Sequence, residues 1–324
     1  MKKIDAIIAA GEKKGSQTII QQNKAFLPLN GKPLIYYIIK ALDQVSMVNS
    51  IIVVGPIYKL DQHLIKTKLL ANIQKDVKFI EEKANLLENA KAGFVASIKQ
   101  VPDDTPFHLL KNSQYENKSV FYLPSDIPLV TSFEINEFLC KADMENYDYS
   151  IGLCSEQILA NYYPRDHVQG IRMSYFHTKD GRFRQNNFHL GKPLKVGNLI
   201  QIENMYEIRY QKKIINMIMM IFRLIKTNKK IYRSLWHYLL LQLGLFSYTY
   251  NLSNPYRAFT RMNSVNNILH CINHLLGTRT EVVMTNYGGA ALDCDNAESY
   301  KVLSAMFSKW MSRQEKIAEN IKQP

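Results

Sequence analysis

The chain has few cysteines, fewer acidic than basic residues, and no long uninterrupted hydrophobic run. Its 4 cysteines are scattered, with no CxxC pair and no histidine at zinc-finger spacing, so neither a disulfide framework nor a zinc finger is indicated. The two most apolar windows are interrupted by Arg223 and His237, and both are shorter than the ~20 residues that span a bilayer. These absences predict a cytoplasmic protein without a transmembrane helix.

The shortage of acidic residues leaves a strong positive charge. The 41 Lys and Arg residues against 28 Asp and Glu give a net charge of +13 and a pI near 9.4. Such a charge attracts nucleic acid, an anionic membrane or phosphorylated small molecules through the same long-range field. Nucleic acid is the least favoured of these partners, because no RNP-like, helix-turn-helix or zinc motif is visible. Hydrophobic residues make up 46% of the chain, which predicts a globular protein.

Short apolar runs alternate with helical segments through the first half of the chain. Buried parallel strands are expected at 5–10, 50–55, 77–80 and 119–123. Helices between and after them are expected at 34–42, 59–73, 88–100 and 133–142. This alternation predicts an α/β protein with three layers, α/β/α, around a mixed, mostly parallel sheet.

Beyond residue 149 the regular alternation ends. Strand-like segments are expected at 149–154, 170–177 and 183–190, and helices at 203–246 and Val265–Leu276. A strand at 281–284 and a final helix at 297–317 then return to the first pattern. The sequence therefore predicts an α/β domain made of residues 1–200 and 281–324, with residues 201–280 as a helical insertion or cap.

The loop after the first expected strand is a candidate phosphate-binding segment. Ala9, Ala10 and Gly11 close the strand, and Lys13 and Lys14 follow. Backbone N–H groups and ammonium groups at this edge of an α/β sheet can wrap a phosphate chain. An exposed charged loop explains the same residues.

Three further charged residues lie where the catalytic groups of such a sheet are found. Lys24 follows the loop, where an ammonium could reach the α-phosphate of a nucleotide. Asp126 ends an apolar strand and Asp295 directly precedes a helix, and Mg²⁺ is held in proteins by one or two carboxylates plus substrate phosphates. Each residue has a simpler explanation, as a surface lysine, an Asx turn or a helix cap.

Taken in order, these segments resemble the nucleotidyltransferase family that includes MobA-like molybdenum-cofactor enzymes and sugar-phosphate cytidylyl- and uridylyltransferases. IAAG at 8–11 resembles the LAAG opening of that family, and KAFLPLNGKPLI at 24–35 resembles K-x-L-x-x-x-x-G-K-P-L-I. SDIPL at 125–129 resembles G-D-x-P-L, and DCDNAESY at 293–300 resembles D-x-D-T-P-E-D. Residues from about 200 to 280 match nothing in the family.

The resemblance implies a fold, a reaction and a set of residue roles. The fold is that of nucleotide-diphospho-sugar transferases of the GT-A type, and the reaction is transfer of NMP from an NTP to a phosphorylated acceptor with release of pyrophosphate. Lys24 would stabilise charge on the α-phosphate, and Asp126 with Asp295 would hold Mg²⁺. Asn89 would lie near the base or ribose, and Asn187 in the acceptor pocket.

The loop after Gly11 departs from the family pattern. The family continues G-x-G-x-R, whereas Glu-Lys-Lys-Gly-Ser follows Gly11 here, and lysine cannot make the bidentate phosphate contact of arginine. Two alternatives therefore stay open. One is a non-catalytic nucleotide-binding or membrane-docking protein on the same fold. The other is an NDP-sugar glycosyltransferase, which the Asp-x-Asp at 293–295 suggests.

Residues 205–250 combine apolar helices with basic borders. From 214 to 225, ten of twelve residues are Ile, Met, Leu or Phe, and Lys or Arg residues stand on both sides. Basic flanks around apolar and aromatic faces are typical of a helix on an anionic membrane surface. We therefore expect a helical subdomain that packs on itself or presents an apolar edge to the inner face of a membrane or to a lipid-linked acceptor.

Overall fold

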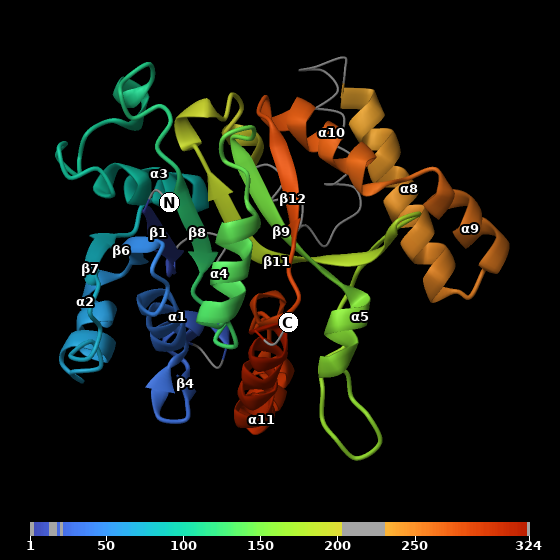
Figure 1. Cartoon of the computed structure of the whole chain (residues 1–324), viewed down its shortest axis with the longest axis horizontal. Helices are drawn as coiled ribbons and strands as arrows, with labels where there is room; N and C mark the ends of the chain where they lie inside the picture. The colour runs from blue at the N-terminus through green and yellow to red at the C-terminus, as the bar shows by residue number, and fades with distance from the viewer. Residues whose placement is uncertain (1–2, 13–17, 20–21, 203–230, 323–324) are drawn as a thin grey trace.

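A mixed sheet runs through the centre of the protein (Figure 1). The computed structural model describes residues 3–12, 18–19, 22–202 and 231–322. In spatial order the main sheet contains β12 (Thr280–Met284), β9 (Tyr149–Ser155), β11 (Gly181–Gly191), β8 (Val120–Pro124), β1 (Ile4–Ala9), β6 (Val48–Gly55) and β7 (Asp76–Glu81). Two small antiparallel pairs are formed by β2 (Thr18–Ile19) with β3 (Gln22–Asn23) and by β4 (Pro28–Leu29) with β5 (Lys32–Pro33).

Parallel pairing joins the strands around β1. β1 pairs in parallel with β6 and β8, and β6 pairs in parallel with β7. β11 runs antiparallel between β8 and β9, and β9 pairs in parallel with β12. The short β10 (Phe176–Thr178) adds an antiparallel pair to β11. The predicted mixed, mostly parallel sheet is confirmed.

Helices cover both faces of the sheet. Their bounds are α1 (Leu34–Asp43), α2 (Ile57–Leu60), α3 (Leu86–Ala96), α4 (Ser132–Lys141), α5 (Glu156–Leu159), α8 (Ile231–Thr249), α9 (Ser253–Arg261), α10 (Val265–Leu276) and α11 (Ala297–Lys322). Side chains of a strand alternate between faces, so β1 sends Ala6 and Ile8 into the core with α1 and α4. Ile7 faces the other way, into the core under α3. The expected three layers are therefore present.

The helices α8, α9 and α10 lie together beside one end of the sheet (Figure 1, orange). The boundaries of α10 are those that the sequence predicts, and a capping residue stands at each end of the helix. The Ser264 hydroxyl accepts the N–H of Asn267 at 3.1 Å, and Gly277 adopts the left-handed conformation that ends many helices.

Two predicted helices differ from the structure. The helix expected at 59–73 is reduced to α2 and a π-helical turn, η2 (Asp61–Ile65). Lys68 has a positive φ of 57°, which a continuous right-handed helix does not allow. Of the stretch expected at 203–246, residues 203–230 lie outside the described part of the chain, and the remainder belongs to α8.

The strand predicted at 170–177 is also shorter than expected. Only β10 has strand pairing there. The Ile171 N–H donates instead to the carbonyl of Tyr162 at 2.8 Å, and the Ile171 side chain packs against the core cluster that contains Tyr162. The apolar character of this segment thus reflects contact with the core and not a longer strand.

The close packing of α3 on β1 depends on Gly93. A Cβ at this position would lie 2.6 Å from Ile7 Cγ2 and 3.2 Å from Val54 Cγ2, and both of these side chains are buried. Gly244 in α8 offers a matched comparison, because the nearest atom to its added Cβ would be Thr260 Cγ2 at 3.8 Å.

We expect Gly93→Ala to lower the free energy of unfolding by about 1–3 kcal/mol, the usual cost of overpacking a core. Gly244→Ala should raise it by up to ~1 kcal/mol, because alanine favours a helix over glycine. Urea denaturation of the two variants measures both changes. Equal effects of the two substitutions would contradict the packing of α3 on β1.

Candidate functional site

Lys24 is held at the edge of the sheet by its neighbour Asn23. Lys24 begins a short 3-10 helix, η1 (Lys24–Phe26), and Asn23 caps it by accepting the N–H of Ala25 at 2.9 Å. The Asn23 side-chain amide also donates to the carbonyl of Ala10 at 2.9 Å. Asn23 therefore ties Lys24 to the end of β1. Sequence reasoning missed Asn23, although an asparagine before a turn is a common cap.

The ammonium of Lys24 lies between two carboxylates. Its Nζ is 3.2 Å from Asp126 Oδ2 and 3.1 Å from Asp295 Oδ1. The Lys24 and Asp126 side chains are only 11% and 17% exposed, whereas Asp295 is 42% exposed. The structure thus brings together the three residues that the sequence motifs singled out.

The two aspartates come from distant segments that are joined by their backbones. Asp126 follows β8, and Asp295 lies two residues before the start of α11. The N–H of Cys294 donates to the carbonyl of Asp126 at 2.9 Å. This bond fixes the distance between the two aspartate-bearing segments.

The charges of this group shift one another's pKa values. Burial alone would lower the pKa of Lys24, but Asp126 and Asp295 outweigh it, so the pKa is raised and the ammonium stays charged. Burial raises the pKa of Asp126 to about 6, against the opposing effect of Lys24. Asp126 is therefore mostly ionised at neutral pH and takes up a proton as the pH falls through about 6.

Asp293 has a different partner from Asp295. Arg184 on β11 donates from Nη2 to Asp293 Oδ1 at 2.6 Å and from Nε to the carbonyl of Ala291 at 3.0 Å. Asp293 is therefore held against β11, while Asp295 contacts Lys24. The two carboxylates of the Asp-x-Asp motif therefore contact different residues in this structure.

A buried carboxyl group holds the loop that leads to Asp295. Glu134 on α4 accepts the N–H of Gly288 at 3.1 Å and that of Ala290 at 2.9 Å. Burial raises the pKa of Glu134 to about 8, although these N–H groups oppose the rise. Asn187 on β11 donates to the carbonyl of Ala290 at 2.9 Å, so both sides of the loop are fixed. Glu134 could not be identified from the sequence, because its partners lie more than 150 residues away in the chain.

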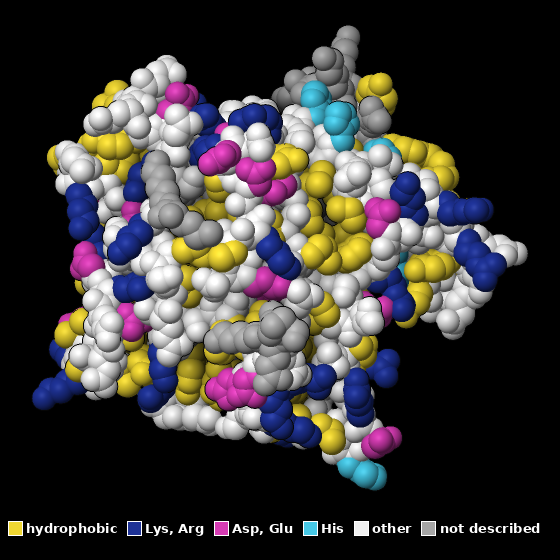
Figure 2. Space-filling view, in the orientation of Figure 1, with side chains coloured by type: hydrophobic (Ala, Val, Ile, Leu, Met, Phe, Trp, Pro, Cys, Tyr) yellow, Lys and Arg dark blue, Asp and Glu magenta, His cyan; other side chains and the backbone are white. Residues whose placement is uncertain are grey.

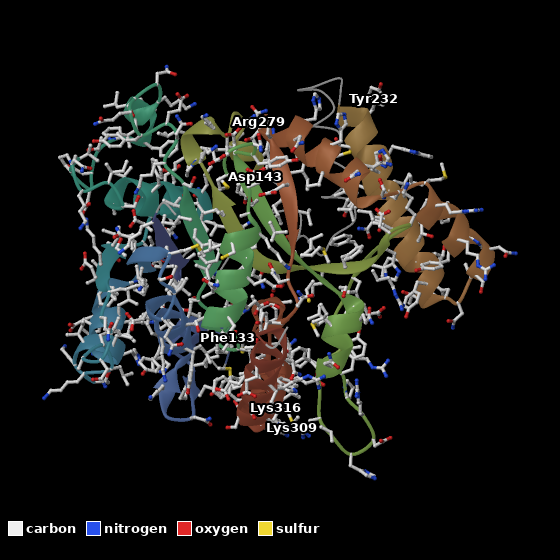
Figure 3. All side chains as sticks on the ribbon, viewed as in Figure 1. Phe133, Asp143, Tyr232, Arg279, Lys309 and Lys316 are labelled. Carbon is white, nitrogen blue, oxygen red and sulfur yellow. The ribbon has the colours of Figure 1, made fainter. Side chains whose placement is uncertain are left out.

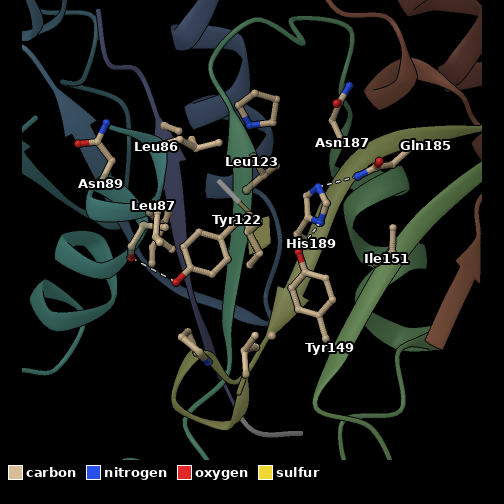
Figure 4. A pocket seen from close by; sticks show the side chains of 18 of the residues that line it. Leu86, Leu87, Asn89, Tyr122, Leu123, Tyr149, Ile151, Gln185, Asn187 and His189 are labelled. Carbon is tan, nitrogen blue, oxygen red and sulfur yellow. Dashed lines mark hydrogen bonds between the residues drawn. The ribbon is translucent and has the colours of Figure 1, made fainter. Parts of the chain in front are cut away.

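A cavity of about 610 Å³ opens beside Lys24 and Asp126. Figure 4 shows part of its lining, which includes Asn89 and Asn187. The predicted residues that line it are Ala9, Gly11, Lys24, Asn89, Asp126 and Asn187. Ala10 lies behind the wall, where its N–H donates to the carbonyl of Val54 at 2.8 Å. Asp295 contacts the cavity-lining Lys24. Lys13 and Lys14 lie outside the described residues. The volume is in the range of pockets that hold small-molecule ligands.

The start of the predicted phosphate loop is held by an acidic side chain. A Cβ on Gly11 would lie 2.9 Å from Asn89 Nδ2 and 2.9 Å from Glu82 Oε2, so the ends of these two side chains pack closely against the glycine. The N–H of Glu12 donates to Glu82 Oε2 at 2.6 Å. A carboxylate therefore accepts a loop N–H that could otherwise be donated to a phosphate.

Asp126 and Asp295 fit a magnesium site that is completed by substrate. Both carboxylates reach the same ammonium, so they converge, and together they carry more negative charge than Lys24 neutralises. Within the described ranges, no group of three or more His, Cys, Asp or Glu side chains is placed to hold a metal ion. Mg²⁺ commonly takes few protein ligands and fills its octahedron with phosphate oxygens and water.

The sheet and this site define an α/β protein with a charged cavity at one edge of its sheet. The chain belongs to the MobA-like NTP transferase domain family, whose model it matches over residues 6–172, about half of its length. The family resemblance of the sequence motifs is thereby confirmed. A curated relative, the 2-C-methyl-D-erythritol 4-phosphate cytidylyltransferase of Clostridium botulinum, is 41% identical over 58 residues, which are 18% of this chain. The matched segment spans only 25% of that relative.

A solved structure shares the fold. A hypothetical transferase from Thermus thermophilus aligns with a TM-score of 0.58 and 16% identity, over 92% of this chain and 99% of that chain. A 4-diphosphocytidyl-2C-methyl-D-erythritol synthase from Anaerococcus prevotii aligns with a TM-score of 0.46 and 13% identity, over 95% and 99% of the two chains. At 16% identity, the first alignment shows a shared architecture.

Proposed function

We propose that this protein is a nucleotidyltransferase that transfers NMP from an NTP to a phosphorylated acceptor and releases pyrophosphate. The observation that carries the proposal is the convergence of Lys24, Asp126 and Asp295 beside one cavity. Membership of the MobA-like NTP transferase family supports the reaction class. The match to a cytidylyltransferase supports it over a shorter segment.

In this reaction an oxygen of the acceptor phosphate attacks the α-phosphorus of the NTP. A P–O bond forms between the acceptor and the α-phosphate, and the bond from the α-phosphorus to the oxygen that bridges to the β-phosphate breaks. Pyrophosphate leaves with that bridging oxygen and its electron pair. Such a transfer needs positioning and charge neutralisation from the protein more than a protein nucleophile.

Lys24 supplies the positive charge in this scheme. An ammonium has three N–H donors, and two of them point to Asp126 and Asp295, so a third can be donated to an α-phosphate oxygen. Asp126 and Asp295 would hold Mg²⁺, which neutralises phosphate oxygens when it is bound. Asp126 must be ionised for this role, and its pKa of about 6 allows it at neutral pH.

The remaining predicted residues take binding roles in the proposal. Ala9, Gly11 and Asn89 line the side of the cavity next to β1 and would contact the nucleotide. Asn187 also lines the cavity, and its hydrogen bond to Ala290 places it beside the loop that leads to Asp295. Asn187 would therefore position the acceptor. Lys13 and Lys14 remain predicted phosphate contacts.

Replacing Lys24 with methionine removes the ammonium and keeps the length of the side chain. We expect kcat/KM for pyrophosphate release to fall about 10²–10³-fold, the usual cost of removing one group that stabilises transition-state charge. The assay combines each of the four NTPs and Mg²⁺ with a panel of sugar and alkyl phosphates. Lys316→Met is the matched control, because Lys316 is exposed near the end of α11 (Figure 3). Full turnover by a folded Lys24→Met protein would exclude the role of Lys24.

A non-catalytic nucleotide-binding protein is the second candidate, and one contact favours it. The Glu82 carboxylate accepts the N–H of Glu12, at the place where a phosphate-binding loop would offer that donor to a ligand. Calorimetry separates the two candidates. Tight NTP binding without turnover of any acceptor in the panel would favour this alternative, whereas turnover that depends on Mg²⁺ would exclude it. An NDP-sugar glycosyltransferase has less support, because Asp293 pairs with Arg184.

We further propose that residues 201–280 form the helical cap predicted from the sequence, and that the cap docks on an anionic membrane. None of the described helices has the length and apolar character to cross a bilayer. Four exposed side chains on α8 are spaced so that they share one side of the helix: Tyr232, Trp236, Leu239 and Phe246. Aromatic and aliphatic side chains on one helix face are typical of a helix lying in the membrane interface.

The positive charge of this region also favours an anionic membrane as the partner. From residue 208 to residue 280 the sequence contains no Asp or Glu, but it contains eleven basic residues. They are Arg209, Lys212, Lys213, Arg223, Lys226, Lys229, Lys230, Arg233, Arg257, Arg261 and Arg279. In Figure 2, hydrophobic and basic side chains lie next to one another on the side where α8 and α9 are found. An anionic bilayer complements both features.

Tyr232→Asp tests the docking surface, because Tyr232 is 70% exposed and projects from the start of α8 (Figure 3). We expect about tenfold weaker binding to phosphatidylglycerol-containing vesicles at low salt, since the change adds a negative charge and removes an aromatic ring. Tyr58→Asp is the matched control, because Tyr58 is 68% exposed but lies on α2. The proposal fails if the unmodified protein does not co-sediment with these vesicles, or binds uncharged vesicles equally well.

A further inference from the structure

The cavity beside Lys24 has a second, apolar end. It extends across β8, β11 and β9 from the α3 side of the sheet to α10, and Figure 1 shows these two helices on either side of those strands. Five residues of α10 line it, and their spacing places them on one side of the helix: Val265, Ile268, Leu269, Ile272 and Leu276. Four of the five are only partly buried. A contiguous apolar helix face left partly exposed beside a proposed active site indicates a ligand with an apolar part.

The walls next to α10 have the same character. Val196, Leu199 and Ile202 line the cavity from the segment after the short helix η5 (Pro193–Lys195). Ile151 and Val282 line it from β9 and β12. Three different parts of the chain therefore contribute aliphatic side chains to this end.

Charged residues are confined to the other end. Among the described residues that line the cavity, the charged ones are Lys24, Lys91 and Asp126. Lys24 follows β3, Lys91 lies on α3, and Asp126 follows β8, so none comes from the α10 side. A ligand that fills the cavity would thus have its charge at one end and an uncharged body at the other.

The floor between the two ends is polar but uncharged. Tyr149 Oη is 2.7 Å from His189 Nδ1, and Gln185 Nε2 is 2.8 Å from His189 Nε2 (Figure 4). Burial lowers the pKa of His189 to about 4, so the ring is neutral at physiological pH. These polar groups bond to one another, and the floor offers no ion pair to a charged acceptor.

We propose that the phosphorylated acceptor is an amphiphile. Its phosphate lies at the end with Lys24 and Asp126, and its hydrocarbon body packs against the face of α10 that carries Leu269 and Ile272. This inference rests on the proposed nucleotidyltransferase function, because it names the substrate class of the same site. A small polar acceptor such as a simple sugar phosphate would leave the apolar end unused.

The test is the binding of n-alkyl monophosphates from methyl to octyl, measured by calorimetry below their micelle concentrations. Each added methylene should tighten binding by about fourfold until the chain fills the apolar end, since burial of one methylene is worth about 0.8 kcal/mol. Leu269→Asn should weaken this dependence on chain length. Leu275→Asn should preserve it, because Leu275 lies on the same helix and is similarly buried but does not line the cavity.

The outcomes distinguish this inference from the function on which it rests. The proposal of an amphiphilic acceptor is overturned if the affinity does not depend on chain length. It is also overturned if Leu269→Asn folds but leaves the chain-length dependence unchanged. Turnover of glycerol phosphate or sugar phosphates without any gain from alkyl chains would leave the nucleotidyltransferase intact and remove the inference. A clear chain-length dependence without turnover of any NTP would support the ligand class and reject the enzyme.

Discussion

The ammonium of Lys24, held between the carboxylates of Asp126 and Asp295, joins three separate parts of this chain at the edge of the sheet. One part follows β3, one follows the central β8 and one precedes the last helix, α11. Without the ammonium, the largely buried Asp126 would stand near a second carboxylate with little solvent to stabilise its charge. The arrangement of the site and its charge state therefore depend on each other. The excess of negative charge that remains suits a metal ion, and the ammonium suits a phosphate.

The rest of the site keeps this group in place. Asn23 ties Lys24 to β1, the Cys294 N–H ties the two aspartate segments together, and Glu134 holds the loop before Asp293 through backbone N–H groups. The cavity that opens from this rigid edge is charged at one end and aliphatic at the other. A region without acidic residues and with exposed aromatic side chains on α8 follows in the chain. Together these features are consistent with an enzyme that handles phosphate at the sheet and hydrocarbon beyond it.

Much of the fold and of the site could be predicted from the sequence, because these features depend on residues that lie close together in the chain. The strands around β1 are continuous apolar runs, α10 is bounded by Ser264 and Gly277, and Lys24, Asp126 and Asp295 each belong to a short motif at a strand end or helix start. The roles of Glu134 and Arg184 could not be predicted, because the groups that they contact lie far away in the sequence. Glu82 was missed for the same reason. The helix after residue 57 is shorter than predicted, because Lys68 adopts a left-handed backbone conformation. A lysine in the sequence does not indicate this conformation.

The most direct test of the central claim is the titration of the Asp126 carboxyl group, followed by carbon NMR and assigned by its loss in Asp126→Asn. The account predicts a pKa of about 6 in the ligand-free protein, because burial outweighs the nearby ammonium. In Lys24→Met the pKa should rise further, because the opposing positive charge is gone. A carboxyl group that titrates near its ordinary value of 3.8 and does not respond to Lys24→Met would show that the two side chains do not meet as described.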